Sequence, residues 1–220
     1  MTKLNIRRLT ESAILIAVAT ILSVIKPINI PFGGGITICA MVPMILLAYR
    51  WGTKWGLFSG FVFGLLQLFI GLATNSFGLS LWATLGMLLM DYIVAYTALG
   101  LGGIFRNKLK NPIAALLTGG TVAVVARYIA HFISGMLFFG SYADTWFFIE
   151  GGPGASMGDY VLSHFDGWGL AALYSGVYNG SLMIGELILT LVALAVIGAI
   201  PVLNKKMEST VKAVPASNPA

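Results

Sequence analysis

The chain has 220 residues, of which 58% are hydrophobic and only 10% are charged, and its mean hydropathy is +0.90. Soluble domains carry about 25% charged residues, so this composition excludes a water-soluble enzyme, a nucleic-acid-binding protein and a disordered chain. The net charge of +5 comes from short basic clusters that separate apolar stretches, which is how membrane proteins encode their topology. A single cysteine, Cys39, excludes an internal disulfide framework and a cysteine metal cluster.

Six apolar stretches are candidates for membrane-crossing helices, which need about 20 mostly apolar residues each. In chain order they cover residues 9–27, 37–49, 55–73, 81–104, 112–140 and 170–201. The second is short and follows three glycines, so it is expected to tilt or to continue into an unwound entry. The first runs into Lys26 and Pro27 without a cleavage-type ending, and we interpret it as a retained helix rather than a signal peptide. The prediction is one all-α membrane domain of six helices over residues 1–204, followed by a polar cytoplasmic tail over residues 205–220.

The basic residues orient this bundle in the membrane. With six crossings, Lys26 is the only lysine or arginine in the loops of one side and Arg127 falls inside a span, so the remaining basic residues all lie on the other side. Loops rich in lysine and arginine stay in the cytoplasm. Both termini are therefore predicted to be cytoplasmic.

The connection over residues 141–168 is the one long loop of this prediction, and it contains several aromatic residues and a Gly-Gly-Pro-Gly turn. Aromatic residues gather at the membrane–water boundary, which favours an ordinary interfacial loop. Long loops in compact domains are often functional, so a lid over an external site is the alternative.

Four ionisable residues fall within predicted spans, where charge is costly and usually faces a cavity or a partner. They are Asp91, Arg127, His131 and Glu186. Arg127 and His131 are four residues apart and so share one helix face. Purely structural alternatives stay open: Asp91 and Arg127 as an ion pair that joins two helices, His131 bonded to a carbonyl, and tyrosines of the sixth span as interfacial anchors. Glu186 has no evident cation partner on its own span and is left unassigned.

The polar residues gather on the last three predicted spans, which favours a shared binding site over scattered packing roles. Asp91 would balance a cation, the rings of Phe139 and Tyr174 offer stacking and cation–π contacts, and His131 and Asn179 supply directional donors and acceptors. This set fits a small, aromatic, cationic ligand with polar edges.

Catalytic and energy-coupling motifs are missing from the sequence. It contains no GxxxxGK[ST] phosphate loop, no HExxH or GxSxG motif, and no inverted repeat between its halves. These absences predict a binding protein, without cofactor or metal, that takes its energy from a partner. Ala13 and Ala17 form a small-xxx-small pair that lets another helix approach closely, although internal packing also explains it.

The sequence resembles the thiamine-specific S component of energy-coupling factor (ECF) transporters over residues 5–201. The His-Phe-x-Ser-Gly and Tyr-Ser-x-x-Tyr-Asn blocks are the most specific part of the resemblance. The segments that carry it are 9–17, 31–37, 41–43, 91–92, 127–135, 138–143 and 174–179.

The resemblance implies an outward-facing, high-affinity vitamin pocket in a six-helix bundle. It also implies an energising module of one transmembrane coupling protein and two ATPase subunits, and a location in the plasma membrane of a prokaryote. The implied thiamine-binding residues are Asp91, Tyr92, Arg127, His131, Phe139, Tyr174 and Asn179, and the implied docking residues are Ala13 and Ala17.

Two positions depart from the family pattern. Gly33 to Gly35 replace a tryptophan found in the first external loop of some members, and Ile38 replaces an acidic residue. Trp82 or the loop around Trp146 is expected to compensate. The alternatives are an S component for another vitamin or a thiamine precursor, and a self-sufficient proton-coupled carrier that uses Asp91 and Glu186.

Overall fold

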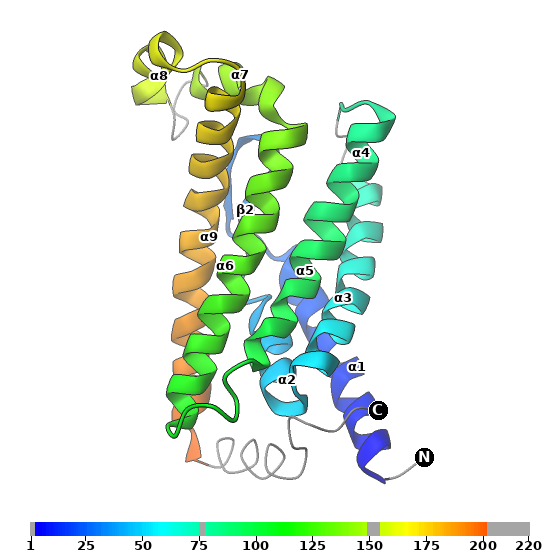
Figure 1. Ribbon diagram of the computed structural model, residues 1–220. Helices are drawn as coiled ribbons and strands as arrows, with labels where there is room; N and C mark the ends of the chain where they lie inside the picture. The colour runs from blue at the N-terminus through cyan, green and yellow to red at the C-terminus, as the bar shows by residue number, and fades with distance from the viewer. Residues whose placement is uncertain (1–2, 75–77, 149–154, 202–220) are drawn as a thin grey trace.

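The computed structural model describes residues 3–74, 78–148 and 155–201, which are almost entirely helical. The long helices run side by side along one direction (Figure 1). The main helical elements are α1 (Lys3–Val24), α2 (Val42–Trp51), α3 (Thr53–Thr74), α4 (Leu81–Met87), η2 (Leu88–Val94), α5 (Ala95–Thr97), η3 (Ala98–Gly103), α6 (Pro112–Phe138), α7 (Ala143–Phe148), α8 (Gly158–His164) and α9 (Gly167–Ala199). Three short 3-10 turns are η1 (Pro31–Gly33), η4 (Gly140–Tyr142) and η5 (Ala155–Met157).

Four helical stretches among the described residues are long and apolar enough to cross a membrane. They are Thr53–Ala73, Leu81–Gly103, Pro112–Phe138 and Gly167–Ala199. These stretches coincide with the third to sixth predicted spans within three residues at each end. The integral-membrane, all-helical class predicted from the sequence is therefore confirmed.

The first two predicted spans differ most from the observed helices. α1 begins at Lys3, before the predicted start, and ends at Val24. α2 begins at Val42 rather than at residue 37 and has ten residues, which gives a length of about 15 Å, half of the roughly 30 Å hydrocarbon core. The backbone before it is irregular, and Cys39 has a positive φ of 57°, a conformation that cannot continue a helix.

The fourth predicted span is one helical body made of α4, η2, α5 and η3. Ser80 caps its start, where the Ser80 hydroxyl accepts a hydrogen bond from the Ala83 backbone N–H. Its middle section, η2, is π-helical and contains Asp91. Because π-turns widen a helix and are common at functional sites, this turn marks Asp91 within an otherwise apolar segment.

α6 begins with the two signals that the sequence pattern Asn-Pro favours. Asn111 Oδ1 accepts hydrogen bonds from the backbone N–H groups of Ile113 and Ala114, and Pro112 occupies the first helical position. α6 then packs along α9 and η3. At Gly119 it approaches η3 so closely that any side chain would collide with the Gly102 carbonyl group.

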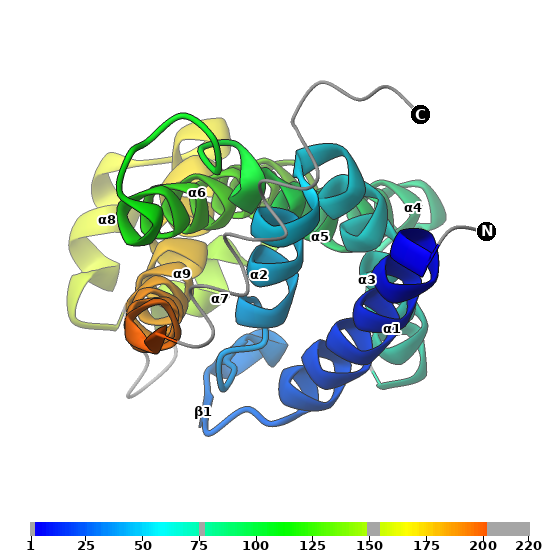
Figure 2. The same cartoon turned by 90° about the horizontal axis from the view of Figure 1, so that it is seen from below.

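The main hydrophobic core surrounds α2, which contacts α1, α3, η3, α6 and α9. Figure 2 shows α2 in the middle of the bundle and α1 at its outer edge beside α3. The buried core residues include Met41, Met44, Ile45, Phe63, Leu99, Leu116, Val124 and Leu194. The short α2 is therefore buried at the centre of the bundle by the surrounding helices.

A small hairpin links α1 to α2. Its strands β1 (Ile28–Asn29) and β2 (Gly35–Ile36) pair antiparallel, with Ile28 opposite Ile36. β2 lies against α9 (Figure 1). Between the strands Phe32 takes a positive φ of 64°, which turns the chain back on itself. The glycine-rich stretch predicted as an unwound entry is thus a folded hairpin.

The predicted external connection over residues 141–168 contains two short helices, α7 and α8, at the end of the bundle opposite α2 (Figure 1). Ala143, Trp146 and Phe147 of α7 are buried with Val161 of α8 and Leu170 of α9 in a second hydrophobic cluster. α7 is therefore packed against α9, and α8 packs against α7. Residues 149–154, which include the predicted Gly-Gly-Pro-Gly turn, lie outside the described residues.

Candidate ligand-binding cavity

A cavity of about 680 Å³ lies inside the bundle between α3, η2, α6, α9 and the hairpin. It is lined by charged, amide and aromatic side chains together with apolar ones. All seven residues predicted as ligand-binding lie around this one cavity: Asp91, Tyr92, Arg127, His131, Phe139, Tyr174 and Asn179. Tertiary packing thus brings together residues from three separate helical segments.

Asp91, His131 and Arg127 form one hydrogen-bonded chain. His131 Nδ1 lies 2.8 Å from Asp91 Oδ1, and Arg127 Nε donates to His131 Nε2 at 3.2 Å. Because Nε2 accepts from Arg127, the imidazole proton resides on Nδ1 and is donated to Asp91. The second oxygen, Asp91 Oδ2, accepts from the Ser134 hydroxyl at 2.8 Å. Asp91 and Arg127 are therefore linked through a neutral imidazole, in place of the direct ion pair considered from the sequence.

Arg127 has a second partner in the bundle. Its guanidinium carbon lies 4.4 Å from the centroid of the Tyr96 ring, a cation–π contact. Tyr96 stacks in turn on Tyr92 at a centroid distance of 6.5 Å, and Tyr92 lies so close to α3 that a side chain on Gly71 would collide with its hydroxyl group. The packed rings of Tyr96 and Tyr92 therefore support the Arg127 end of the hydrogen-bonded chain.

Aromatic side chains form a further part of the cavity lining, here called the aromatic wall. Tyr174 and Tyr178 on α9 have ring centroids 5.5 Å apart. The ring centroids of Phe139 and Tyr142 are 6.0 Å apart. Those of Tyr142 and Phe32 are 5.4 Å apart, in an edge-to-face arrangement. A flat ring bound in this cavity therefore meets several aromatic faces or edges, the contacts that favour a heterocycle.

Tyr178 and Asn179 tie the walls of the cavity together. The Tyr178 hydroxyl donates to the Pro31 carbonyl at 2.9 Å and accepts from the Gly34 N–H at 3.0 Å, which fastens the hairpin to α9. The Asn179 amide nitrogen donates to the His131 carbonyl at 3.2 Å and to the Ser175 carbonyl at 3.1 Å. This use of the amide nitrogen leaves the Asn179 carbonyl oxygen as the group it offers to a ligand.

Residues 9–146 match the family described as "Thiamine transporter protein" (Thia_YuaJ). The chain belongs to this family. It is 37% identical over 148 residues to a curated relative from Bacillus subtilis (strain 168), "Thiamine transporter ThiT", a match that covers 62% of this chain and 72% of the relative. A protein of the same name from Lacticaseibacillus paracasei is 29% identical over 114 residues, 47% of this chain and 54% of that one.

The fold agrees with that of a solved family member. A crystal structure of ThiT from Listeria monocytogenes superposes with a TM-score of 0.65 and 28% sequence identity, covering 90% of this chain and 97% of that one. The resemblance predicted from the sequence is therefore confirmed. As a family member, this chain is a multi-pass membrane transport protein of the cell membrane, and not an enzyme.

The predicted substitutes for the missing family tryptophan do not line the cavity. Trp82 on α4 is 80% exposed and does not belong to the described cavity residues. Trp146 on α7 is fully buried behind the aromatic wall, with its ring 5.6 Å from Tyr174 and 6.0 Å from Tyr178. Phe32, between Pro31 and Gly33 in the same loop as the missing tryptophan, contributes the aromatic ring instead.

Glu186 is the most informative residue that the sequence left unassigned. It lines the cavity yet is only 2% exposed. Its Oε1 atom accepts hydrogen bonds from the Thr37 N–H at 2.6 Å and the Thr37 hydroxyl at 2.7 Å. The only sign of this site in the sequence was an ionisable residue within an apolar span. The contact itself could not be predicted, because Thr37 is distant in the chain and lies on the segment after β2.

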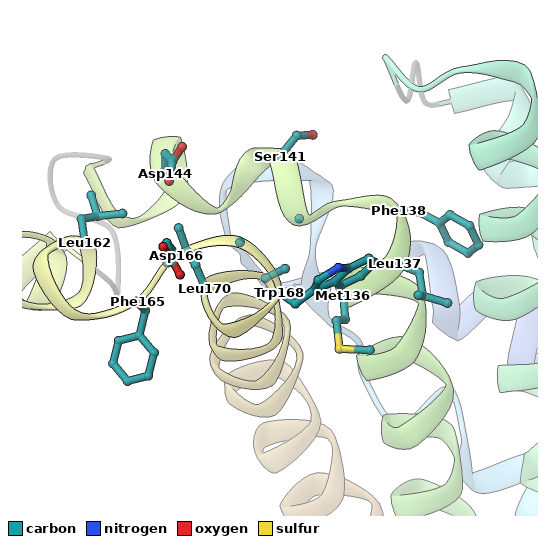
Figure 3. A pocket seen from close by; sticks show the side chains of 13 residues that line it. Met136, Leu137, Phe138, Ser141, Asp144, Leu162, Phe165, Asp166, Trp168 and Leu170 are labelled. Carbon is teal, nitrogen blue, oxygen red and sulfur yellow. The ribbon is translucent and has the colours of Figure 1, made fainter.

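A second hollow lies near the end of the bundle opposite α2, between the end of α6, the helices α7 and α8, and the start of α9 (Figure 3). It is lined by Asp144, Asp166 and Trp168 among others. Trp168 is largely exposed, and Phe138 and Phe165 point outward on opposite sides of the hollow in Figure 3. None of the seven residues predicted as ligand-binding belongs to the described lining of this hollow. All of them line the larger cavity inside the bundle.

Proposed function

We propose that this chain is the thiamine-binding S component of an ECF-type uptake transporter, which captures thiamine outside the cell and delivers it with an ATP-driven partner module. The observation that carries the proposal is the cavity in which the Asp91–His131–Arg127 chain faces a wall of aromatic rings. Thiamine joins an aminopyrimidine ring, with hydrogen-bonding edges, to a positively charged thiazolium ring. Both kinds of group have matching partners in this cavity, and the side chains present need no metal or cofactor to bind them.

The side chains divide between the polar and the flat parts of such a ligand. Asp91, His131 and the Asn179 carbonyl oxygen form a polar cluster suited to the edge of the aminopyrimidine. Phe139 and Tyr174 offer ring faces for stacking. A ligand without matching donors and acceptors leaves the buried polar groups unpaired, which is how such a site gains specificity.

The proposed topology has six crossings with both termini in the cytoplasm. α1 and α2 are included as the first two crossings, with α2 reaching the outer side through the hairpin. Basic residues support the orientation, because Arg7 and Arg50 both pair with Glu11 at the α1–α2 end of the bundle. Arg106, also at that end, is buried, and burial lowers the pKa of its guanidinium group. α7 and α8 are then external.

The outer face of α1 supports docking on a transmembrane coupling protein. Ala13 and Ala17 are exposed one helical turn apart, and the neighbouring Ile14 and Ile21 are 58% and 61% exposed. Small residues allow close helix approach, and flanking apolar residues suit a second helix in lipid. The ATPase activity would belong to the two partner subunits, because the chain contains no phosphate-binding loop.

The binding test is a titration of the purified full-length protein with thiamine, followed by calorimetry or tryptophan fluorescence. We expect tight binding in the wild type, a large loss in Asp91→Asn and His131→Ala, and no change in Trp82→Phe, which lies outside the cavity. A panel of other vitamins and of pyrimidine precursors runs in parallel. Tighter binding of a panel compound than of thiamine would overturn the thiamine assignment.

The transport test separates the S component from a self-sufficient carrier. Proteoliposomes containing the chain alone, under a pH gradient, are compared with proteoliposomes that also contain the coupling protein and both ATPases. We expect uptake only in the second set, and loss of uptake with retained binding in Ala13→Trp. Uptake by the chain alone would refute the S-component assignment.

A further inference from the structure

Glu186 occupies a second acidic position in the cavity, on α9 and away from Asp91. We propose that Glu186 holds the positively charged ring of the ligand, while Asp91 serves the neutral, hydrogen-bonding ring. This inference rests on the proposed function, and it fixes which end of the ligand lies at which end of the cavity.

The charge of Asp91 is already balanced within the protein. Both of its carboxylate oxygens accept hydrogen bonds, one from His131 and one from Ser134. Through the neutral imidazole of His131 it is coupled to the Arg127 guanidinium. The carboxylate, imidazole and guanidinium together carry no net charge, so they offer a ligand polar edges rather than an unbalanced negative charge.

Glu186 carries a negative charge that the described part of the protein leaves unbalanced. Both hydrogen bonds to its Oε1 atom come from the neutral donors of Thr37. Its Oε2 atom is buried with no hydrogen-bond partner in the structure. Among the described residues, no lysine or arginine lies within 4.0 Å of this carboxylate. Lys26, which also lines the cavity, is exposed.

A buried carboxylate without a partner is costly unless a cation or donors reach it. Glu186 lines a cavity large enough for a ligand, so a cation bound there lies beside this carboxylate. A positively charged, weakly hydrated heterocycle is the class of ligand that removes this cost. A neutral ligand of the same shape would leave the charge unbalanced.

The distance along α9 between Asn179 and Glu186 indicates how far apart the two rings of the ligand would lie. Asn179, Met183 and Glu186 all line the cavity at positions i, i+4 and i+7, which share one helix face. Seven residues correspond to about 10 Å along the helix axis. Asn179 is bonded to the backbone of His131 beside the polar cluster, so Glu186 lies about two helical turns away from that cluster along α9. This arrangement suits two linked rings, one polar and one charged.

The test crosses two ligands with the wild type and Glu186→Gln in the purified full-length protein. The ligands are thiamine and an analogue in which a neutral thiophene ring replaces the thiazolium. Glutamine keeps an oxygen that accepts from Thr37 and removes only the charge. We expect Glu186→Gln to weaken thiamine binding by about tenfold or more, the scale of a lost buried charge contact, and the analogue by less than about threefold.

Two further variants act as controls. Thr190→Val alters a buried residue one turn further along α9, outside the described cavity lining, and should leave both affinities unchanged. Asp91→Asn should weaken thiamine and the analogue by similar factors, because both contain the same pyrimidine ring. Retained binding of the neutral analogue by Glu186→Gln shows that this variant is folded.

The outcomes separate the two levels of the proposal. A wild type that binds neither compound overturns the proposed function and this inference with it. If the wild type binds thiamine, but Glu186→Gln weakens both ligands equally or neither, then only the assignment of Glu186 to the cation fails. A selective loss of thiamine in Asp91→Asn, and not in Glu186→Gln, assigns the cation to Asp91 and also overturns it.

Discussion

The hydroxyl group of Tyr178 is the point at which the hairpin is fastened over the cavity, and its removal gives a quantitative prediction. Tyr178→Phe deletes one hydrogen bond donated to Pro31 and one accepted from Gly34. The ring itself stays, together with its packing against Trp146 and Tyr174. The substitution therefore loosens the hairpin without emptying the aromatic wall.

The size of the effect follows from those two bonds. A neutral intramolecular hydrogen bond contributes about 1 kcal/mol net, so the closed hairpin loses about 2 kcal/mol relative to an open one. Since 1.4 kcal/mol is a factor of ten, closure becomes about 30-fold less favourable. Because the hairpin lines the cavity, we expect most of this factor to appear as faster release of the ligand, as changes at one interface usually affect dissociation.

The assay is stopped-flow tryptophan fluorescence on purified protein loaded with thiamine, in which an excess of a non-quenching competitor reports the dissociation rate. Tyr160→Phe, an exposed tyrosine of α8 outside the cavity lining, is the matched control and should release thiamine at the wild-type rate. If Tyr178→Phe binds thiamine and releases it within about threefold of the wild-type rate, the hydroxyl does not hold the hairpin closed and the reasoning is wrong.

Three further predictions concern other parts of the protein. Ser134→Ala removes one of the donors to Asp91, and calorimetry should show thiamine affinity reduced by about threefold to tenfold; an unchanged affinity would mean that Ser134 does not orient the carboxylate. Gly119→Val places a side chain against the Gly102 carbonyl, and the midpoint of thermal unfolding should fall by several degrees. Gly169→Ala, whose added Cβ would meet only the Phe165 ring at an ordinary van der Waals distance of 3.9 Å, should leave the midpoint unchanged. Deletion of residues 151–158 tests the alternative that this connection is a lid: a lid predicts faster release of thiamine, and an unchanged rate would reject that role.

The membrane class and the later helices were predictable because they depend on local properties of the chain. Apolar length alone located the helices over Thr53–Ala73, Pro112–Phe138 and Gly167–Ala199 within a few residues. Asn111 and Pro112 marked the start of α6 through capping rules that involve only neighbouring residues. Ionisable residues inside apolar stretches were also visible as exceptions, and those predicted as ligand-binding all line one cavity.

Prediction failed where a segment is held by contacts with distant parts of the chain. The second helix was predicted to begin at residue 37, but α2 begins at Val42 and has only ten residues, which the surrounding helices bury. α7 packs into a hydrophobic cluster through Trp146, although the aromatic composition of its loop favoured an interfacial position at the membrane boundary. The glycines at 33–35 form a hairpin because Tyr178, far along the chain, supplies the bonds that hold it.

Hydropathy and charge are sums over neighbouring residues, so the sequence by itself determined that this chain lies in a membrane, where its later helices run, and which polar side chains are exceptional. The pairing of those side chains depends on which helix faces lie opposite one another, and only the tertiary structure decided that. It joined Asp91 to His131 and gave Glu186 the donors of Thr37. As a result, the first carboxylate is balanced by charges within the protein and the second faces the cavity without a counter-charge.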